Sequence, residues 1–257
     1  MIEIEFNNTK TRATIVLNRK DKSNAMNTAW IKKFSEVLDQ VSSVSSVKIC
    51  IIQSAAKHFC VGADIAWMQA SLDLSVEDNM KDVALLANLF NKLYRLPAIT
   101  IAAVHGAVFG GGLGLLACCD FVIADQDANF CFSEIKLGLM PATIAPYVAQ
   151  KMSLQVMRRL MLSAEAFQAQ QAYSWGLVDE VTEHLNDTIT SWINRFLPRS
   201  KQALLEGKQM FAELSGINEV FSAQATSRLA RMRQSADGQE GLKAFLEKRL
   251  PIWKDDV

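Results

Sequence analysis

Four glycines in five positions, Gly110, Gly111, Gly112 and Gly114, interrupt a long apolar stretch, and no charged residue follows them before Asp120. The apolar run 98–104 before the glycines predicts a buried strand, and the residues from Leu115 onward predict a helix. The chain must therefore pass from a buried strand into a helix through a turn that presents main chain rather than side chains.

The spacing of these glycines excludes two common nucleotide-binding loops. A dinucleotide fingerprint needs a sixth-position glycine where this chain has Leu115, and a P-loop needs a lysine that does not come until Lys136. Two interpretations remain. The glycines let a helix and a strand pack closely, or free amide groups at the helix start bind an oxygen. Loop 60–64 also consists of small residues and follows a buried strand, so it could supply a second amide and complete an oxyanion hole.

Strands, loops and helices alternate through the first two-thirds of the chain, which predicts an α/β fold. Residues 2–6, 14–17, 47–52, 98–104, 121–124 and 128–132 have strand patterns. Helices are expected at 27–41, with Asn27 as the N-cap, and from Ser75, which opens a capping box, to about Arg95. After about Ser153 nearly all periodicity is helical, with helices expected at 154–162, 166–175, 186–196, 199–214 and 217–233. We expect a core of residues 1–195 and a helical oligomerisation region of residues 196–257, because the apolar faces exceed what packing on one sheet requires.

Composition narrows the class of protein. Lys plus Arg equals Asp plus Glu, 27 against 27, which argues against a nucleic-acid partner and gives no reason to expect a membrane. None of the five cysteines forms CxxC, and the three histidines have no metal-ligand spacing, so no metal site is expected. The first residues lack the pattern of a signal peptide. We therefore expect a cytoplasmic protein with buried, reduced thiols.

Several motifs resemble those of the crotonase (enoyl-CoA hydratase/isomerase) superfamily, and their mutual spacing matches across nearly the whole chain. The motifs are FCVGADI at 59–65, IAAVHG at 101–106, GGG at 110–112, CD at 119–120 and FSEIKLG at 132–138, with LNR to NA at 17–25 and EGLKAFLEK at 240–248. The resemblance implies a spiral of ββα units with a C-terminal helical trimerisation region, assembled as a homotrimer or homohexamer.

The same resemblance implies an active site. The amides of Ala63 and Gly111 would bind the thioester oxygen of an acyl-CoA, and Glu134 would be the acid/base. Family hydratases commonly have a second glutamate two residues after the glycine triplet, where this chain has Gly114. The substrate supplies the coenzyme A, so no separate cofactor is expected.

The resemblance also implies a set of residues that contact the CoA ester. Phe245 and Lys248 are similar to residues that a neighbouring protomer offers to the nucleotide, and Trp67 could line the acyl pocket or simply pack. The remaining matches are Lys22, Ser23, Ala25, Val61, Gly62, Asp64, Ile65 and Gly110. Asp64 and Asp120 are expected to bond backbone around their loops, and His105 to be a packed, hydrogen-bonded residue.

Three functions remain open at this point. The motifs after residue 117 are most similar to a bacterial branch that resembles methylglutaconyl-CoA hydratases and also lacks the second glutamate, which favours hydration of a branched enoyl-CoA. A single carboxylate would also serve a Δ3–Δ2-enoyl-CoA isomerase, which moves one proton between two carbons. The incomplete acid/base pair is also compatible with a catalytically silent acyl-CoA binding protein.

Overall fold

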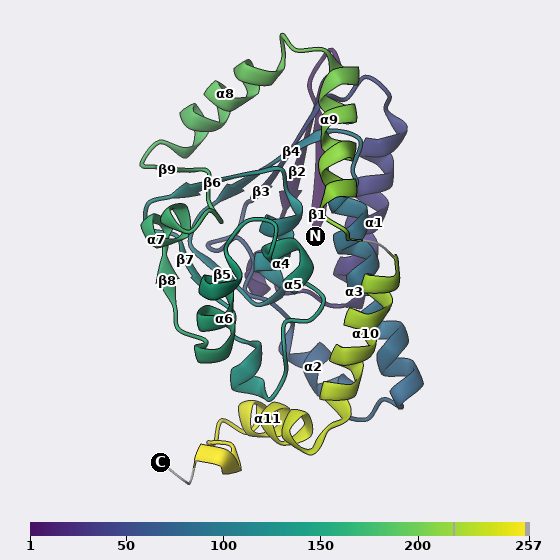
Figure 1. Cartoon of the computed structure of the whole chain (residues 1–257), viewed down its shortest axis with the longest axis vertical. Helices are drawn as coiled ribbons and strands as arrows, with labels where there is room; N and C mark the ends of the chain where they lie inside the picture. The colour runs from purple at the N-terminus through teal and green to yellow at the C-terminus, as the bar shows by residue number, and fades with distance from the viewer. Residues whose placement is uncertain (218, 255–257) are drawn as a thin grey trace.

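The computed structural model of the chain describes residues 1–217 and 219–254. Asn218, within the helix expected at 217–233, and residues 255–257, within the expected C-terminal region, lie outside the described residues. Figure 1 shows two sheets surrounded by helices, with the last helices on one side and at the bottom of the view.

The strands form a large sheet and a small one. The large sheet has the order β1-β2-β3-β4-β6-β9, in which only the β1–β2 pair is antiparallel. Its strands are β1 (Ile2–Phe6), β2 (Arg12–Leu17), β3 (Ile49–Ser54), β4 (Ile99–Val104), β6 (Phe121–Asp125) and β9 (Glu180–Thr182). The small sheet has the order β5-β7-β8, formed by β5 (Ala107–Phe109), β7 (Asn129–Cys131) and β8 (Phe167–Gln168).

Successive turns of chain repeat one pattern. Strand β4 of the large sheet leads into β5 of the small one, and β6 leads into β7 in the same way. After β3, Cys60 pairs with Val108 and so extends the small sheet by one bridge. The repeated unit of two strands and a helix is the spiral of ββα units that the sequence predicted.

The helices begin where the capping residues indicated. The side chain of Asn27 accepts a hydrogen bond from the Trp30 amide, and that of Ser75 from the Asp78 amide. The helices are α1 (Thr28–Ser43), α2 (Ile65–Ser71), α3 (Val76–Tyr94), α4 (Gly111–Cys118), α5 (Ala145–Val148), α6 (Leu154–Ser163), α7 (Ala169–Ser174), α8 (Leu185–Phe196), α9 (Lys201–Leu214), α10 (Glu219–Gln234) and α11 (Ala236–Leu246), with short 3₁₀ turns η1 (Lys20–Lys22), η2 (Glu134–Leu137) and η3 (Ile252–Lys254).

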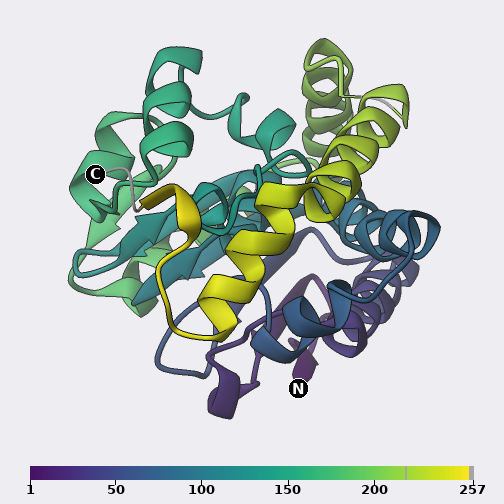
Figure 2. The ribbon, with the colours of Figure 1, turned by 90° about the horizontal axis from the view of Figure 1, so that it is seen from below.

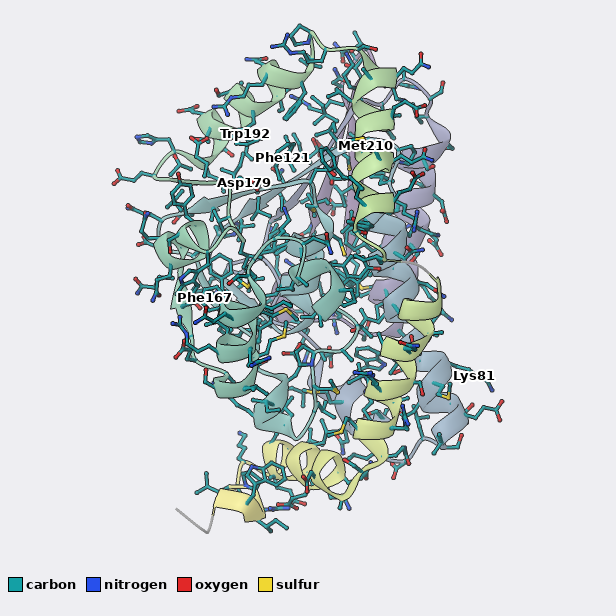
Figure 3. The ribbon with its side chains drawn as sticks, in the orientation of Figure 1. Lys81, Phe121, Phe167, Asp179, Trp192 and Met210 are labelled. Atoms are coloured by element: carbon teal, nitrogen blue, oxygen red, sulfur yellow. The ribbon has the colours of Figure 1, made fainter. Side chains whose placement is uncertain are left out.

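The central strands β3, β4 and β6 of the large sheet are buried on both faces because helices cover each face. Alternate side chains of a strand point to opposite faces, so Ile51 and Ile101 pack against α8 while Ile52 belongs to the main core on the other side. Under α8, the rings of Trp192 and Phe121 lie 4.9 Å apart between centroids (Figure 3). This packing holds β3 and β4 rigidly, and the functional loops follow these strands.

The last three helices surround the core from outside. Helix α10 packs along α3, and α11 crosses beneath the sheets, as the view from below shows (Figure 2). Helix α9 presents Met210, Phe211 and Leu214 to solvent.

Two strands interrupt the region in which the sequence indicated helices almost exclusively. The helix expected at 166–175 begins only at Ala169, because Phe167 and Gln168 pair with β7 as strand β8. The Phe167 ring is buried and stacks on Phe130. Strand β9 likewise pairs with β6. Both strands are too short to produce a detectable alternation in the sequence.

Candidate active site

A cavity of about 570 Å³ lies between the loops that follow β3 and β5, the η2 turn and helices α2, α10 and α11. Most of its wall is apolar, as is usual for a small-molecule site. Twelve of the fourteen predicted site residues line it: Lys22, Ala25, Val61, Gly62, Ala63, Asp64, Ile65, Trp67, Gly110, Gly111, Glu134 and Phe245. Ser23 and Lys248 do not line this cavity.

The amide of Ala63 is oriented by its neighbours in the loop after β3. The Met26 amide donates to the carbonyl of Gly62 at 2.7 Å, and the Asp64 amide donates to the carbonyl of Met26 at 2.8 Å. Successive amides of an extended segment point in opposite directions, so the Ala63 amide points away from Met26. It donates no hydrogen bond to any described residue.

The segment that contains Met26 is itself fixed by Asn24. The fully buried side-chain amide of Asn24 donates to the Phe59 carbonyl at 3.0 Å, and its oxygen accepts from the Arg19 amide at 2.9 Å. A buried amide satisfied in this way holds two loops in one register, which explains why this residue belongs to the motif at 17–25.

The amide of Gly111 is the second free donor. Gly110 adopts φ +50° and ψ −124°, a conformation open to glycine and costly for other residues. Its own amide donates to Cys131 at 3.0 Å, so β7 fixes the turn. Gly111 is the first residue of α4, and its amide has no partner among the described residues, as is normal for the first turn of a helix. The oxygen-binding interpretation of the glycines therefore has geometric support, and the helix begins four residues earlier than expected.

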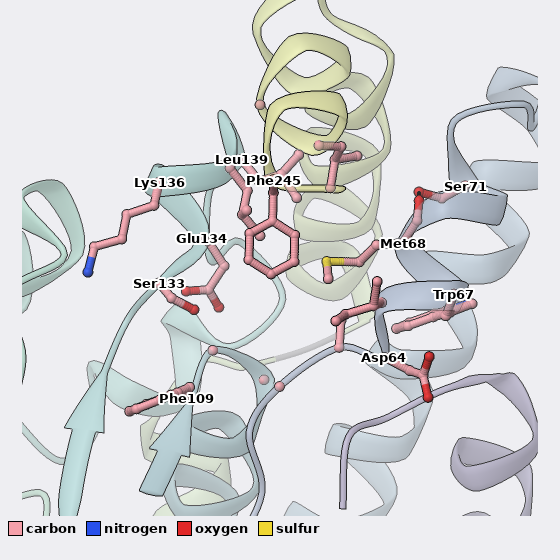
Figure 4. Close-up of a pocket in the computed structure, with 18 of the residues that line it drawn as sticks. Asp64, Trp67, Met68, Ser71, Phe109, Ser133, Glu134, Lys136, Leu139 and Phe245 are labelled. Carbon is pink, nitrogen blue, oxygen red and sulfur yellow. Dashed lines mark hydrogen bonds between the residues drawn. The ribbon is translucent and has the colours of Figure 1, made fainter. Parts of the chain in front are cut away.

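Glu134 is the first residue of η2, which follows β7. Its Oε2 atom is buried and has no hydrogen-bond partner among the described residues. Burial raises the pKa of Glu134 to about 7, with a smaller opposing effect from its own amide. Figure 4 shows its carboxyl group turned into the cavity, beneath Phe245.

The two free amides and the desolvated carboxyl group thus share one cavity wall, near Gly110. A β-carbon placed on Gly110 would lie 3.4 Å from Oε1 of Glu134, and the next residue carries the Gly111 amide. Fixed N–H donors can stabilise negative charge that develops on a carbonyl oxygen. A carboxyl group with a pKa near 7 can both accept and return a proton.

Comparison with known proteins identifies the family to which this site belongs. The sequence profile of the family described as enoyl-CoA hydratase/isomerase matches residues 7–256. The chain belongs to the enoyl-CoA hydratase/isomerase family.

Individual relatives have the same fold and carry related names. The crystal structure of an enoyl-CoA hydratase from Shewanella pealeana is 37% identical with a TM-score of 0.81, and the match covers 98% of this chain and 95% of that one. The 2,3-dehydroadipyl-CoA hydratase of Escherichia coli is 32% identical over 93% of this chain and 94% of its own. The mevalonyl-coenzyme A hydratase of Aspergillus fumigatus is 30% identical, with 93% and 90% covered. The chain is therefore an enzyme of the enoyl-CoA hydratase class.

In this hydratase-family enzyme the position of the missing second glutamate is filled by packing. A β-carbon on Gly114 would overlap Cγ2 of Ile144 and lie 2.8 Å from Cζ of Phe90. Ile144 and Phe90 are both fully buried in the main core. The absence of a carboxylate at Gly114 is therefore built into the packing of α4 against α3 and the segment before α5.

Asp64 has the structural role expected for it. Burial disfavours its ionisation, but the Ala66 amide and the Arg19 guanidinium outweigh that effect and hold the pKa of Asp64 below its usual range. Its side chain caps α2 by accepting from Ala66 and lies 2.6 Å from Nη2 of Arg19. In Figure 4 the carboxylate of Asp64 points away from Glu134.

Helix α11 covers the cavity of its own chain. Phe245 lines this chain's cavity, and its expected contact with the nucleotide bound by a neighbouring protomer stays a prediction. The helix approaches η2 so closely that a β-carbon on Gly241 would overlap the main-chain carbonyl of Leu137. Lys248 follows α11, where its amide donates to Phe245. Ser23 lies at the opposite side of the site, and its carbonyl accepts from the Val61 amide.

The remaining expectations concern residues outside the chemistry. Asp120 bonds backbone as expected, accepting from the Thr100 amide at 2.7 Å, and Nε2 of His105 is 2.8 Å from the Ala56 carbonyl. All five cysteines are free and buried, and burial raises the pKa of Cys119 to about 12, so this thiol stays protonated.

No three His, Cys, Asp or Glu side chains in the described part of the chain gather into a metal-binding group. No helix of residues 1–217 and 219–254 has the length and hydropathy needed to cross a bilayer.

Sequence reasoning missed several residues of the cavity wall. Arg233 and Ser133 contribute polar groups, and Ser133 stood inside a quoted motif without being given a role. Met68, which the sequence suggested beside Trp67 as a possible part of the acyl pocket, does line the cavity. Other apolar contributors are distant in sequence and gave no local signal, among them Met26, Leu86, Leu139, Ile144 and Leu229.

Proposed function

We propose that this enzyme adds water across the 2,3 double bond of a branched 2-enoyl-CoA, with Glu134 as its single acid/base. The observation that carries the proposal is the shared cavity wall: two partnerless amides, from Ala63 and Gly111, beside one desolvated carboxyl group.

In the proposed reaction, the proton transfers and the stabilisation of the enolate use only these three groups. The ionised Glu134 takes a proton from water while the water oxygen bonds to the β-carbon and the double-bond electrons move onto the thioester oxygen. The amides of Ala63 and Gly111 stabilise that enolate oxygen. The enolate then collapses, and its α-carbon takes the proton back from Glu134, which regenerates the carboxylate.

Product analysis in heavy-oxygen water tests the proposal directly. A 2-enoyl-CoA incubated with the enzyme should yield a 3-hydroxyacyl-CoA that carries the heavy oxygen at carbon 3. The Glu134→Gln variant should bind the CoA ester as tightly as the wild type and form no labelled product. If the wild type leaves the substrate unchanged, or yields a product without the heavy oxygen, the proposal is overturned. Binding of the CoA ester without turnover would indicate a silent binding protein.

The filled position at Gly114 favours a second candidate, a Δ3–Δ2-enoyl-CoA isomerase. Ile144 and Phe90 leave no space for the second carboxylate, and isomerisation requires only one group to carry a proton between the α- and γ-carbons. A 3-enoyl-CoA converted to the 2-enoyl isomer without oxygen uptake would support this candidate, and formation of the 3-hydroxy product alone would exclude it.

For the substrate we propose a branched acyl group of the 3-methylglutaconyl-CoA type, which carries one free carboxylate in addition to the thioester. Arg233 is the buried cation in the cavity wall that could meet it. Its Nη1 lies 2.9 Å from Oδ2 of Asp82, and its guanidinium lies 5.1 Å from the ring centroid of Trp67. Among the described residues it donates a hydrogen bond to Asp82 alone, so further N–H donors remain for a substrate oxygen.

A comparison of substrates isolates this role of Arg233. Arg233→Gln should raise the KM for 3-methylglutaconyl-CoA at least about tenfold, because losing a buried charge partner costs well over the free energy of one factor of ten. The KM for the uncharged 3-methylcrotonyl-CoA and for crotonyl-CoA should change little. An equal rise for all three would show that Arg233 only supports the fold.

The assembly, the domain division and the location complete the proposal. The exposed apolar residues of α9, Met210, Phe211 and Leu214, support a helical oligomerisation region at 196–257 and a homotrimer or homohexamer. The five free, buried cysteines support a cytoplasmic location. We propose no cofactor besides the coenzyme A of the substrate.

A further inference from the structure

Ser133 occupies a helix-cap position without capping the helix. It is the residue before η2, where a serine normally accepts a hydrogen bond from an amide in the first turn. Its side chain makes no such bond, and its hydroxyl has no hydrogen-bond partner among the described residues. The hydroxyl is therefore free for a group that enters the cavity.

The free hydroxyl lies next to the reacting groups. A β-carbon placed on Gly110 would be 3.5 Å from Oγ of Ser133 and 3.4 Å from Oε1 of Glu134, so both oxygens border the same space beside the Gly111 amide. Both residues line the cavity, and Figure 4 shows the hydroxyl and the carboxyl group together on one side of it.

In the proposed hydration, no residue has yet been assigned to orient the attacking water. A single carboxylate can take the proton from water, but a second hydrogen bond is needed to keep the water oxygen aimed at the β-carbon. No carboxylate can be supplied from Gly114, because Ile144 and Phe90 fill that space. Of the polar side chains in the wall, Ser133 is the neighbour of Glu134 in the chain and around Gly110.

We propose that Ser133 is a second catalytic residue, whose hydroxyl hydrogen-bonds the attacking water while Glu134 removes its proton. This inference rests on the proposed hydration. Ser133 stays neutral throughout: the water proton goes to Glu134, the new carbon–oxygen bond forms at the β-carbon, and the same proton then returns to the α-carbon. The hydroxyl orients the oxygen and neither gains nor loses a proton.

The test compares two serines at helix starts that differ in what their hydroxyls do. Ser153 lies outside the cavity and caps α6 in the ordinary way, by accepting from the Val156 amide at 3.4 Å. Ser153→Ala should lower Tm and leave kcat unchanged. Ser133→Ala should lower kcat for hydration about tenfold to a hundredfold, the range expected for a misplaced reactant, with KM and Tm unchanged. Ser133→Thr, which retains the hydroxyl, should recover most of the kcat.

Two results would overturn the role of Ser133. One is a Ser133→Ala variant with the wild-type kcat, and the other is a Ser133→Thr variant as slow as the alanine variant. These results are distinguishable from failure of the proposed function, because label incorporation from heavy-oxygen water by the wild type is measured first. If the wild type incorporates label and Ser133→Ala does so equally fast, only the inference about Ser133 fails.

Discussion

The two flanks of α4 differ in a way that shapes the chemistry of the site. On the flank facing η2, the carboxyl group of Glu134 is desolvated and unbonded, and it borders open space. On the flank facing α3, the space beside Gly114 is filled by the buried side chains of Ile144 and Phe90. The same helix therefore carries a working wall on one side and close-packed core on the other.

This contrast shows that a missing catalytic group need not leave a gap. In the proposed reaction, Glu134 on the η2 flank alone carries the proton, and the α3 flank contributes only packing.

The largest expected effect follows from removing the only acid/base of the working flank. Glu134→Gln should lower kcat by about 10²- to 10⁴-fold, the usual contribution of a general acid/base, because the amide cannot take the water proton. Steady-state kinetics and isothermal titration with a CoA ester give the two readouts. A variant that retains more than about a tenth of the wild-type kcat would show that another group carries the proton.

The amide between the two flanks comes next. Gly111→Pro deletes one N–H at the first helical position, where proline is well tolerated, and should lower kcat by about 10²- to 10³-fold. Gly111→Ala is the matched control, because its β-carbon meets the nearest atom, Sδ of Met26, only at an ordinary 3.4 Å and the N–H remains. An equal loss of kcat in Gly111→Pro and Gly111→Ala would contradict an oxyanion role for this amide.

The packed flank can be tested by restoring the missing carboxylate. Gly114→Glu should destabilise the fold by at least about 1–3 kcal/mol, as overpacked cores do, and should not raise the hydration rate. Thermal unfolding and crotonyl-CoA kinetics measure both effects. Adding Ile144→Gly should relieve part of the destabilisation, since the first overlap is with Ile144. Faster hydration by the single variant would mean that the flank is less rigid than its packing indicates.

The last two predictions concern pH. Because burial raises the pKa of Glu134 to about 7, the base form predominates only above that pH, and kcat/KM should fall as pH drops through about 7. A midpoint near the ordinary value for glutamate would show that substrate-free Glu134 is solvated.

The same raised pKa makes a prediction about stability. The folded state binds this proton more tightly than the unfolded chain, so the contribution of Glu134 is present at acid pH and lost as pH rises from about 4.5 to about 7. The loss is on the order of 3 kcal/mol. Glu134→Gln should remove this part of the pH dependence. Denaturant unfolding at pH 5 and pH 8 measures the free energy of unfolding at each pH. If the difference between these two free energies is the same in the variant and the wild type, the prediction is wrong.

The working flank could be predicted from the sequence because its parts lie in local motifs. Glu134 lies just after β7, Gly111 lies just after β5, and Ala63 lies in the loop after β3. The glycines predicted a turn that presents main chain. The capping residues Asn27 and Ser75 were predicted for the same reason, since a cap acts within three residues.

The packed flank could not be predicted, because it depends on contacts between distant segments. Ile144 and Phe90 lie far from Gly114 in the sequence, and neither has a local pattern that indicates which glycine it covers. Strand β8 was missed for the same reason, because its two residues pair with the distant strand β7. A side chain without a local partner, such as Ser133, becomes noticeable only when all possible partners have been located.

Because α11 packs closely against η2, we expect the last helix and the turn that carries Glu134 to move together. Leu137, three residues after Glu134, is pressed against the main chain at Gly241 with no side chain between them. A force or a substitution that displaces the helix must also move the turn. A shortened protein without residues 236–254 would lose activity through a displaced proton carrier, even with every substrate contact of the other loops intact.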